Sequence, residues 1–213
     1  MDKFTSKDAI ASFSNIDRNM RNHRDYLIEI DGELGDGDLG LTMTKGAAAA
    51  VEAVGGCAED DVGAVLKKAG FAIAKAAPST MGTLMATGFI AAGKALAGNS
   101  FLDSKGMALM MRSIAESVKE RGKANEGDKT ILDILFPVAR AMEKFEGGDL
   151  TALMKEAVAT ADGALEKTKE MINQHGKAAV FREKSLGRVD PGSSAVVLVI
   201  KGFAEACGAF CWE

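Results

Sequence analysis

Apolar residues recur at every third or fourth position along most of the chain, which is the spacing of one face of an α-helix. The first such stripe consists of Ile10, Phe13, Ile16, Met20, Leu27 and Ile30. Glycines, prolines and clusters of polar residues separate the stripes. We expect eight helices, over residues 5–30, through Met43 to about 54, 61–73, 82–97, 107–118, 131–145, 149–172 and 190–211.

Residues at the helix ends support several of these boundaries. Thr5 is followed three residues later by Asp8, which is the spacing of an N-terminal capping box. Asp190 before Pro191 offers a capping carboxylate followed by proline at the first helical position. Pro137 falls inside the sixth predicted helix, where it should produce a kink. Further candidates for N-caps are Asp60, Asp61 and Asp149.

The run Val196–Ile200 could form either a buried strand or a buried helix. The cap upstream of it and the lack of a partner strand elsewhere favour a helix. The chain has no linker, low-complexity tract or internal repeat. We therefore expect one all-α domain over residues 1–213, built as a barrel or bundle of about eight helices.

Composition narrows the class of protein. Hydrophobic residues make up 47% of the 213 residues and charged residues 26%, so the chain can bury a core and is not disordered. The net charge of −4 argues against binding to nucleic acid or to an anionic membrane. Aromatic residues reach only 6%, which disfavours a platform for stacking bases.

Cysteine usage and the N-terminus indicate the cellular compartment. Cys57, Cys207 and Cys211 are odd in number and lack the spacing of metal ligands, so we expect buried or free thiols in a reducing environment. The N-terminal residues lack the basic and then apolar pattern of a signal peptide, and no apolar stretch reaches the length of a membrane span. Together these observations predict a cytoplasmic protein.

The segment Asp31–Gly40 is the most informative part of the chain. Asp31, Asp36 and Asp38 lie within eight residues and are separated mostly by glycine. Crowded carboxylates repel one another, and a cation among them would relieve that repulsion. Oxygen ligands of this kind suit Mg²⁺ or Ca²⁺. From the residue types alone, a solvated acidic turn with capping roles is the open alternative.

Three other segments could receive an anion or could simply connect helices. They are Pro78–Thr83, Arg121–Thr130 and Asp190–Ser194. The first and third place hydroxyl groups and free backbone N–H groups at the start of a helix, where phosphate binds well. The two histidines, His23 and His175, belong to no nucleophilic pattern, so the sequence shows no covalent nucleophile.

These segments together resemble a known family. Leu34–Asp38, Pro78–Thr87, Arg121–Ala124, Gly127–Thr130 and Asp190–Gly192 are similar, in this order, to the L subunit of dihydroxyacetone kinases, which is their nucleotide-binding subunit or domain. The resemblance covers nearly the whole chain. It implies a barrel of eight antiparallel helices that binds ADP or ATP at one end, and a kinase that transfers a phosphoryl group to an alcohol acceptor.

The resemblance also implies the residues of the site. Asp31, Asp36 and Asp38 would be the catalytic residues and would hold two Mg²⁺ ions that bridge to the phosphates. The residues implied in nucleotide binding are Leu39, Gly40, Leu41, Thr42, Thr80, Met81, Gly122, Ile131, Lys177, Asp190, Pro191 and Gly192. Phosphoryl transfer needs mainly positioning and charge neutralisation, which fits a site without a nucleophile.

The chain departs from the family pattern at three positions. Leu39 stands where the family usually has histidine, and Met81 stands in a run where it usually has serine. Lys177 replaces an arginine, which keeps the charge but loses the bidentate fork of the guanidinium group. These departures indicate a divergent member, whose acceptor could be a different short-chain ketose.

The resemblance further implies partners. The ketose would sit on a separate K-type subunit, and a phosphocarrier protein could rephosphorylate a retained ADP. The residues leave open whether ATP exchanges freely or ADP is retained. Two other functions also stay open at this point: a non-catalytic helical partner that senses nucleotide, and a plain metal-binding helical domain.

Overall fold

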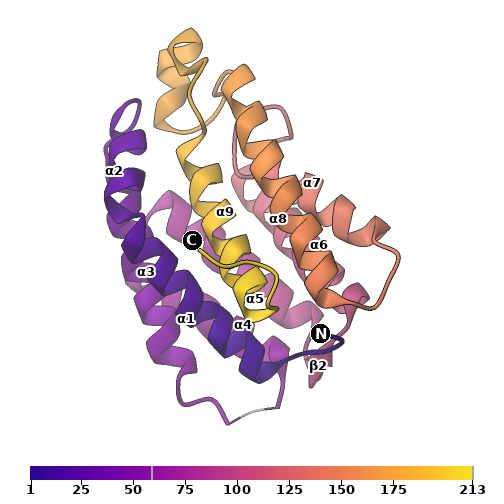
Figure 1. Ribbon diagram of the computed structural model, residues 1–213. Helices are drawn as coiled ribbons and strands as arrows, with labels where there is room; N and C mark the ends of the chain where they lie inside the picture. Colours follow the sequence, from indigo (N-terminus) through magenta and orange to yellow (C-terminus); the bar gives the residue numbers. More distant parts are fainter. Residues whose placement is uncertain (59, 213) are drawn as a thin grey trace.

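The computed structural model describes residues 1–58 and 60–212, and helices dominate this part of the chain (Figure 1). The α-helices are α1 (Ser6–Asn22), α2 (Arg24–Gly32), α3 (Leu39–Val54), α4 (Val62–Ala76), α5 (Thr80–Ala95), α6 (Ser104–Gly122), α7 (Leu132–Lys144), α8 (Leu150–Lys167) and α9 (Pro191–Ala206). Two short 3-10 helices follow α8, namely η1 (Thr168–Glu170) and η2 (Lys177–Ser185). The strands β1 (Phe4–Thr5) and β2 (Phe101–Leu102) form an antiparallel pair.

Eight of these helices form a closed ring. α1 packs against α3, α3 packs against α4, and each later helix packs against the next until α9 returns to α1. α2 lies at one end of the ring and packs mainly on α3 (Figure 1). The prediction of an all-α barrel of about eight helices is therefore confirmed for the described residues.

The interior of the ring is apolar and contains an aromatic cluster. Phe13 of α1, Phe89 of α5 and Phe203 of α9 meet there, with ring centroids 5.2–6.3 Å apart. Aromatic pairs at such distances stabilise a core beyond the burial of their area. Over residues 1–58 and 60–212, every helix is too short or too polar to cross a lipid bilayer.

The predicted helix starts are confirmed at the positions where a cap was expected. Thr5 and Asp8 form a reciprocal capping box at the start of α1. The side chains of Asp61 and Asp149 cap α4 and α8. Asp190 caps α9, in which Pro191 is the first residue. The ambiguous run 196–200 is helical and buried inside α9, as expected from the cap upstream.

The first predicted helix is in fact two helices, α1 and α2, that meet at His23. The backbone of His23 leaves the helical region, with φ −106° and ψ 13°, while its N–H still donates to the carbonyl of Asn19. The apolar stripe continues across this break because Leu27 is buried again on the far side. Periodicity alone therefore could not show the change of direction. The break sends α2 toward α3 and so places Asp31.

Two predicted helices end five residues earlier than expected. α8 stops at Lys167 and not at Ile172, because the hydroxyl of Thr168 donates to the carbonyl of Leu165 and accepts the N–H of Asp190. α9 stops at Ala206 and not at Cys211. There Gly208 adopts φ +63°, and Ala209 N–H donates to the carbonyl of Ala204 over 2.8 Å, as in a Schellman motif. Pro137 lies inside α7, which extends on both sides of it.

Candidate functional site

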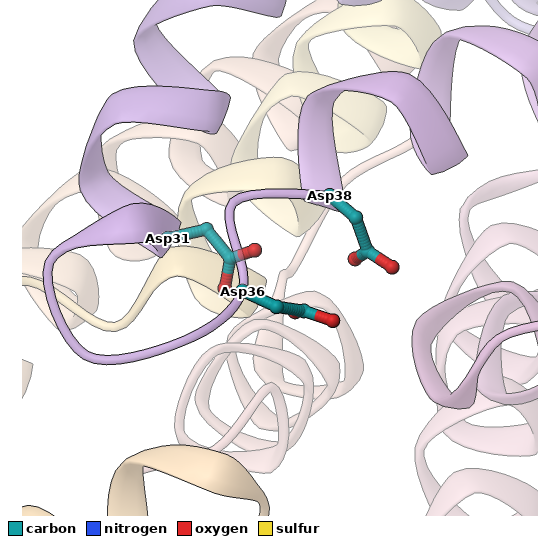
Figure 2. A group of neighbouring side chains, drawn as sticks. All are labelled: Asp31, Asp36 and Asp38. Carbon is teal, nitrogen blue, oxygen red and sulfur yellow. The ribbon is translucent and has the colours of Figure 1, made fainter.

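We call residues 31–40 the acidic loop. Its three aspartates converge where α2 ends and α3 begins. Asp31 lies in the last turn of α2, Asp36 lies in the connecting loop, and Asp38 is the N-cap residue of α3. Each offers one carboxylate oxygen, and these oxygens all lie within 4.8 Å of one another (Figure 2). Such a set of hard oxygen donors fits Mg²⁺. The structure therefore brings together all three residues that the sequence singled out.

The glycines of the loop let these carboxylates approach one another. Gly37 adopts φ +69°, a conformation that other residues rarely take. A β-carbon on Gly35 would lie 2.6 Å from Oδ1 of Asp31. A β-carbon on Gly40 would lie 2.2 Å from the carbonyl oxygen of Arg24, so α2 and α3 can pack closely only with glycine there. The position of Asp31 relative to Asp38 thus depends on the close packing of α2 on α3 at Gly40.

Hydrogen bonds leave the carboxylates largely available to a cation. Oδ2 of Asp31 accepts the backbone N–H of Leu39 over 3.2 Å. Asp38 occupies the N-cap position of α3, but its own side chain makes no capping hydrogen bond. The carboxylate of Asp38 is therefore unused by the helix that it begins. The first-turn N–H groups of Gly40 and Leu41 are likewise left without a side-chain cap.

The pKa shifts differ among Asp31, Asp36 and Asp38, which we call the triad. Burial raises the pKa of Asp31 above its ordinary value of 3.8, and the neighbouring Asp36 and Asp38 raise it further. The ammonium group of Lys177, in η2, donates to Oδ2 of Asp36. This bond lowers the pKa of the Asp36 carboxyl and raises that of the lysine. In Figure 1 the segment after α8 lies at the same end of the ring as α2.

We expect Asp31→Asn to stabilise the protein at pH 7 without divalent ions. A carboxyl whose folded pKa is raised binds protons more tightly when folded, so its unfavourable contribution is present at neutral pH. That contribution fades as pH falls through the raised pKa toward 3.8. Urea unfolding in EDTA at pH 7 and near pH 4 measures both effects. A variant that is less stable than the wild type at pH 7 would contradict this assignment of the pKa shift.

A second group of predicted residues meets where the starts of α5 and α9 approach the loop before α7. A β-carbon on Gly192 would lie 3.1 Å from Cγ2 of Ile131 and 3.8 Å from Sδ of Met81. A β-carbon on Gly122 would lie 3.5 Å from Cδ2 of Leu84, one turn along α5 from Met81. These contacts form an apolar cluster of Met81, Ile131 and Gly192, in which Ile131 is buried and the other two are half-buried.

The remaining predicted residues are placed as follows. Leu39 and Gly40 are buried in the first turn of α3, Leu41 is 54% exposed, and Thr42 is half-buried. Thr80 is exposed at the start of α5, and Pro191 is half-buried at the start of α9. Asp190 is buried, and its Oδ2 accepts the N–H of Ser193 over 2.7 Å. Burial raises the pKa of that carboxyl.

Sequence reasoning missed a buried polar network behind this site. Lys129, Asp133 and Asn173 are each at most 5% exposed. Asp133 accepts the N–H groups of Gly127 and Thr130, over 2.6 and 2.7 Å, and so fixes the turn before α7. The motif Gly127–Thr130 was visible in the sequence, but a charged residue in a polar loop is expected to face solvent. The burial of Lys129 depends on contacts with residues that are distant in the sequence.

Comparison with known proteins places the chain in a family. A family model described as the DAK2 domain matches residues 33–205. The ADP-binding subunit DhaL of the PEP-dependent dihydroxyacetone kinase of Escherichia coli is 32% identical over 184 residues, which are 85% of this chain and 88% of that protein. An L-erythrulose kinase of Pectobacterium atrosepticum is 33% identical over 80% of this chain, which spans only 30% of that kinase.

The fold also occurs in a solved structure. The dihydroxyacetone kinase of C. freundii superimposes with a TM-score of 0.72 at 21% identity, over 92% of this chain and 34% of that one. A second crystal structure of that kinase is a complex with AMP-PNP and Mg²⁺. The resemblance noted in the sequence is confirmed by these matches, and the chain belongs to the DAK2 domain family.

Proposed function

We propose that this chain is the nucleotide-binding subunit of a kinase for dihydroxyacetone or a related short-chain ketose, working in the cytoplasm. The observation that carries the proposal is the convergence of three carboxylates at the uncapped start of α3, in a chain of the DAK2 family. The names of the E. coli and P. atrosepticum relatives support a phosphotransferase that acts on such ketoses.

The donor set of the acidic loop supports two bound Mg²⁺ ions. Asp31, Asp36 and Asp38 would hold them, and each ion would supply positive charge that offsets the charge on the phosphates during transfer. The chain's own part is to fix these carboxylates rigidly, through the glycines of the loop and through the N–H of Leu39 on Asp31. A preorganised set of this kind loses little free energy to rearrangement when the nucleotide binds.

The helix starts suggest how the nucleotide lies. Asp38 does not cap α3, and the N–H groups of Gly40 and Leu41 have no side-chain partner in the described structure, whereas Ser79 caps α5 and Asp190 caps α9. A helix start with free N–H groups attracts phosphate. We therefore place the phosphates at the start of α3, beside Lys177. We place the purine beside Met81 and Gly192, the half-buried members of the apolar cluster that Ile131 supports from within.

The acceptor ketose belongs, in this proposal, on a separate K-type subunit, and a phosphocarrier protein is a further partner. The E. coli relative is named as a subunit of a PEP-dependent kinase. Among the described residues of this chain, the acidic loop is the one cluster of potential metal ligands, and neither histidine adjoins it. Within the described part of the chain, neither histidine belongs to the carboxylate cluster, which supports placing the ketose on a partner subunit.

We expect the isolated protein, with Mg²⁺ and ATP, to leave dihydroxyacetone and tetruloses unphosphorylated. Product formation followed by chromatography measures this directly. Adding a K-type subunit from a related kinase, together with that kinase's phosphocarrier and its phosphoryl donor, should start turnover, and this arm is the positive control. Robust turnover by the homogeneous isolated protein would show that the ketose site lies on this chain. It would contradict the proposal that the nucleotide and the ketose bind to separate subunits.

A further inference from the structure

Lys129 is a buried lysine that links the loop before α7 to the segment between α8 and α9. Its side chain is 1% exposed. Its ammonium group donates to the carbonyl oxygens of Met171 over 3.2 Å and of Arg188 over 2.8 Å, and also to that of Ser185. An ammonium group has three protons to donate, so these three carbonyls satisfy it completely. They lie near both ends of one segment, residues 171–189, which we call the late loop.

Two features of Lys129 are unfavourable for the stability of the folded protein. Burial of an ammonium group is unfavourable, and here it lowers the pKa of Lys129, although the nearby Asp190 acts in the opposite direction. The backbone of Lys129 also adopts φ +57°, which is uncommon for a residue with a side chain. Two unfavourable features at one residue are tolerated where the surrounding contacts demand them. At Lys129 these contacts are its three hydrogen bonds to carbonyl groups of the late loop.

Apolar packing adds little to the attachment of the late loop. Val180, Phe181 and Leu186 are exposed, so burial of apolar surface contributes little to its order. Asn173 adds to the same network, because its side-chain amide donates to the carbonyl of Lys129 over 3.0 Å. The exposed contacts of the loop include the N–H of Gln174 and the ring of His175, both on Asp128. The polar contacts around Lys129 and Asn173 are its buried attachment to the ring.

The late loop touches the acidic loop at two points. Lys177 donates to Asp36 of the acidic loop, and Arg188 forms an ion pair with Glu33. The loop then leads directly into Asp190 and the start of α9. Any loss of its order would move the one cation that contacts the triad in the described structure.

We propose that Lys129 is a positioning residue that fastens the late loop over the nucleotide site, so that Lys177 is in place before the nucleotide arrives. This inference rests on the proposed function for its kinetic part. Without the anchor, only a fraction of molecules would hold the loop in the binding-competent form, and the apparent affinity falls by that fraction. If one molecule in ten is competent, the KM for the nucleotide rises about tenfold. Saturating nucleotide restores the ordered loop, so kcat changes little.

The test compares the wild type with Lys129→Met, which removes the ammonium group and nearly keeps the volume. Hydrogen exchange followed by mass spectrometry should show at least tenfold faster exchange in residues 171–189, with α3 and α5 unchanged. Trypsin should cleave faster at the loop's exposed Arg182 and Lys184. Lys123→Met is the matched control, because Lys123 also has a positive φ, of 53°, but is exposed. Its late loop should exchange like that of the wild type.

Activity with a K-type partner provides the second readout. We expect Lys129→Met to raise the KM for Mg-nucleotide at least tenfold and to leave kcat within about threefold. A purely structural role would lower kcat through a smaller folded fraction and leave KM unchanged. Unchanged exchange in the late loop, or a loosened loop with an unchanged KM, would overturn the proposal.

The test remains informative if the variant does not fold or if the wild type does not bind nucleotide. Where Lys129→Met fails to fold, Lys129→Gln replaces it. Its amide has only two N–H donors, so at least one of the three carbonyls loses its partner and the late loop should exchange faster than in the wild type. Exchange equal to that of the wild type would overturn the anchor. If the wild type itself binds no Mg-nucleotide, the proposed function fails, whereas hydrogen exchange still tests whether Lys129 orders the loop.

Discussion

Asp36→Asn should reduce phosphoryl transfer by roughly 100-fold or more while the protein stays folded. The two side chains are nearly the same size, and Asp36 lies on the surface of the loop, so helix packing should not change. The substitution removes a full negative charge from the triad. Loss of a group that merely supports a metal ligand lowers affinity or activity by about 10–100-fold. Loss of a ligand itself should have at least that effect.

Thermal unfolding with and without Mg-ADP separates binding from folding in this variant. A ligand that binds only the folded protein raises its melting temperature. The wild type should show this rise and Asp36→Asn should not. Asp25→Asn is the matched control, because it removes the same charge from the exposed side of α2. If Asp36→Asn keeps both the thermal shift and the activity, Asp36 is a turn residue and not a metal ligand.

Gly40→Ala should destabilise the protein by about 3 kcal/mol, which is the upper part of the range for overpacked sites. The added β-carbon would lie 2.2 Å from the carbonyl oxygen of Arg24 and 2.8 Å from Cγ1 of Ile28. Backbone cannot yield as a flexible side chain does, so α2 must move away from α3. For a protein of this size the melting temperature should fall by about 6–12 °C.

The same displacement should weaken metal binding, because it separates Asp31 on α2 from Asp38 on α3. Calorimetry with Mg²⁺ and ADP on the folded variant, at a temperature well below its melting point, measures this loss. Gly163→Ala is the control: Gly163 is exposed within α8, and a β-carbon there would meet nothing within 4 Å. That variant should gain about 0.5–1 kcal/mol. Equal stability of Gly40→Ala and the wild type would contradict the close packing of α2 on α3.

Local rules were enough to predict most of the ring. The helical period of the apolar stripes and the capping residues Asp61, Asp149 and Asp190 marked helices that the structure contains. The convergence of Asp31, Asp36 and Asp38 could also be predicted, because the glycines between them allow the loop to turn tightly. These features depend on residues that are close in sequence.

Features that depend on distant residues could not be predicted. The break at His23 keeps the apolar period, so the stripe continued through it. The contact of Lys177 with Asp36 joins positions 141 residues apart. Lys129 gives no local sign that it is buried, because its three acceptors belong to the late loop. The resemblance to a family supplied the remaining site residues, whose roles as nucleotide ligands stay predictions.

The most direct test of a metal-bridged nucleotide is calorimetric titration of ADP into the wild-type protein, with Mg²⁺ in one arm and EDTA in the other. The carboxylates of Asp31, Asp36 and Asp38 repel a diphosphate unless a cation lies between them. We predict saturable binding with Mg²⁺ and affinity at least 100-fold weaker in EDTA. Equal affinity in the two arms would contradict the account, because it would show that the nucleotide binds without the metal centre.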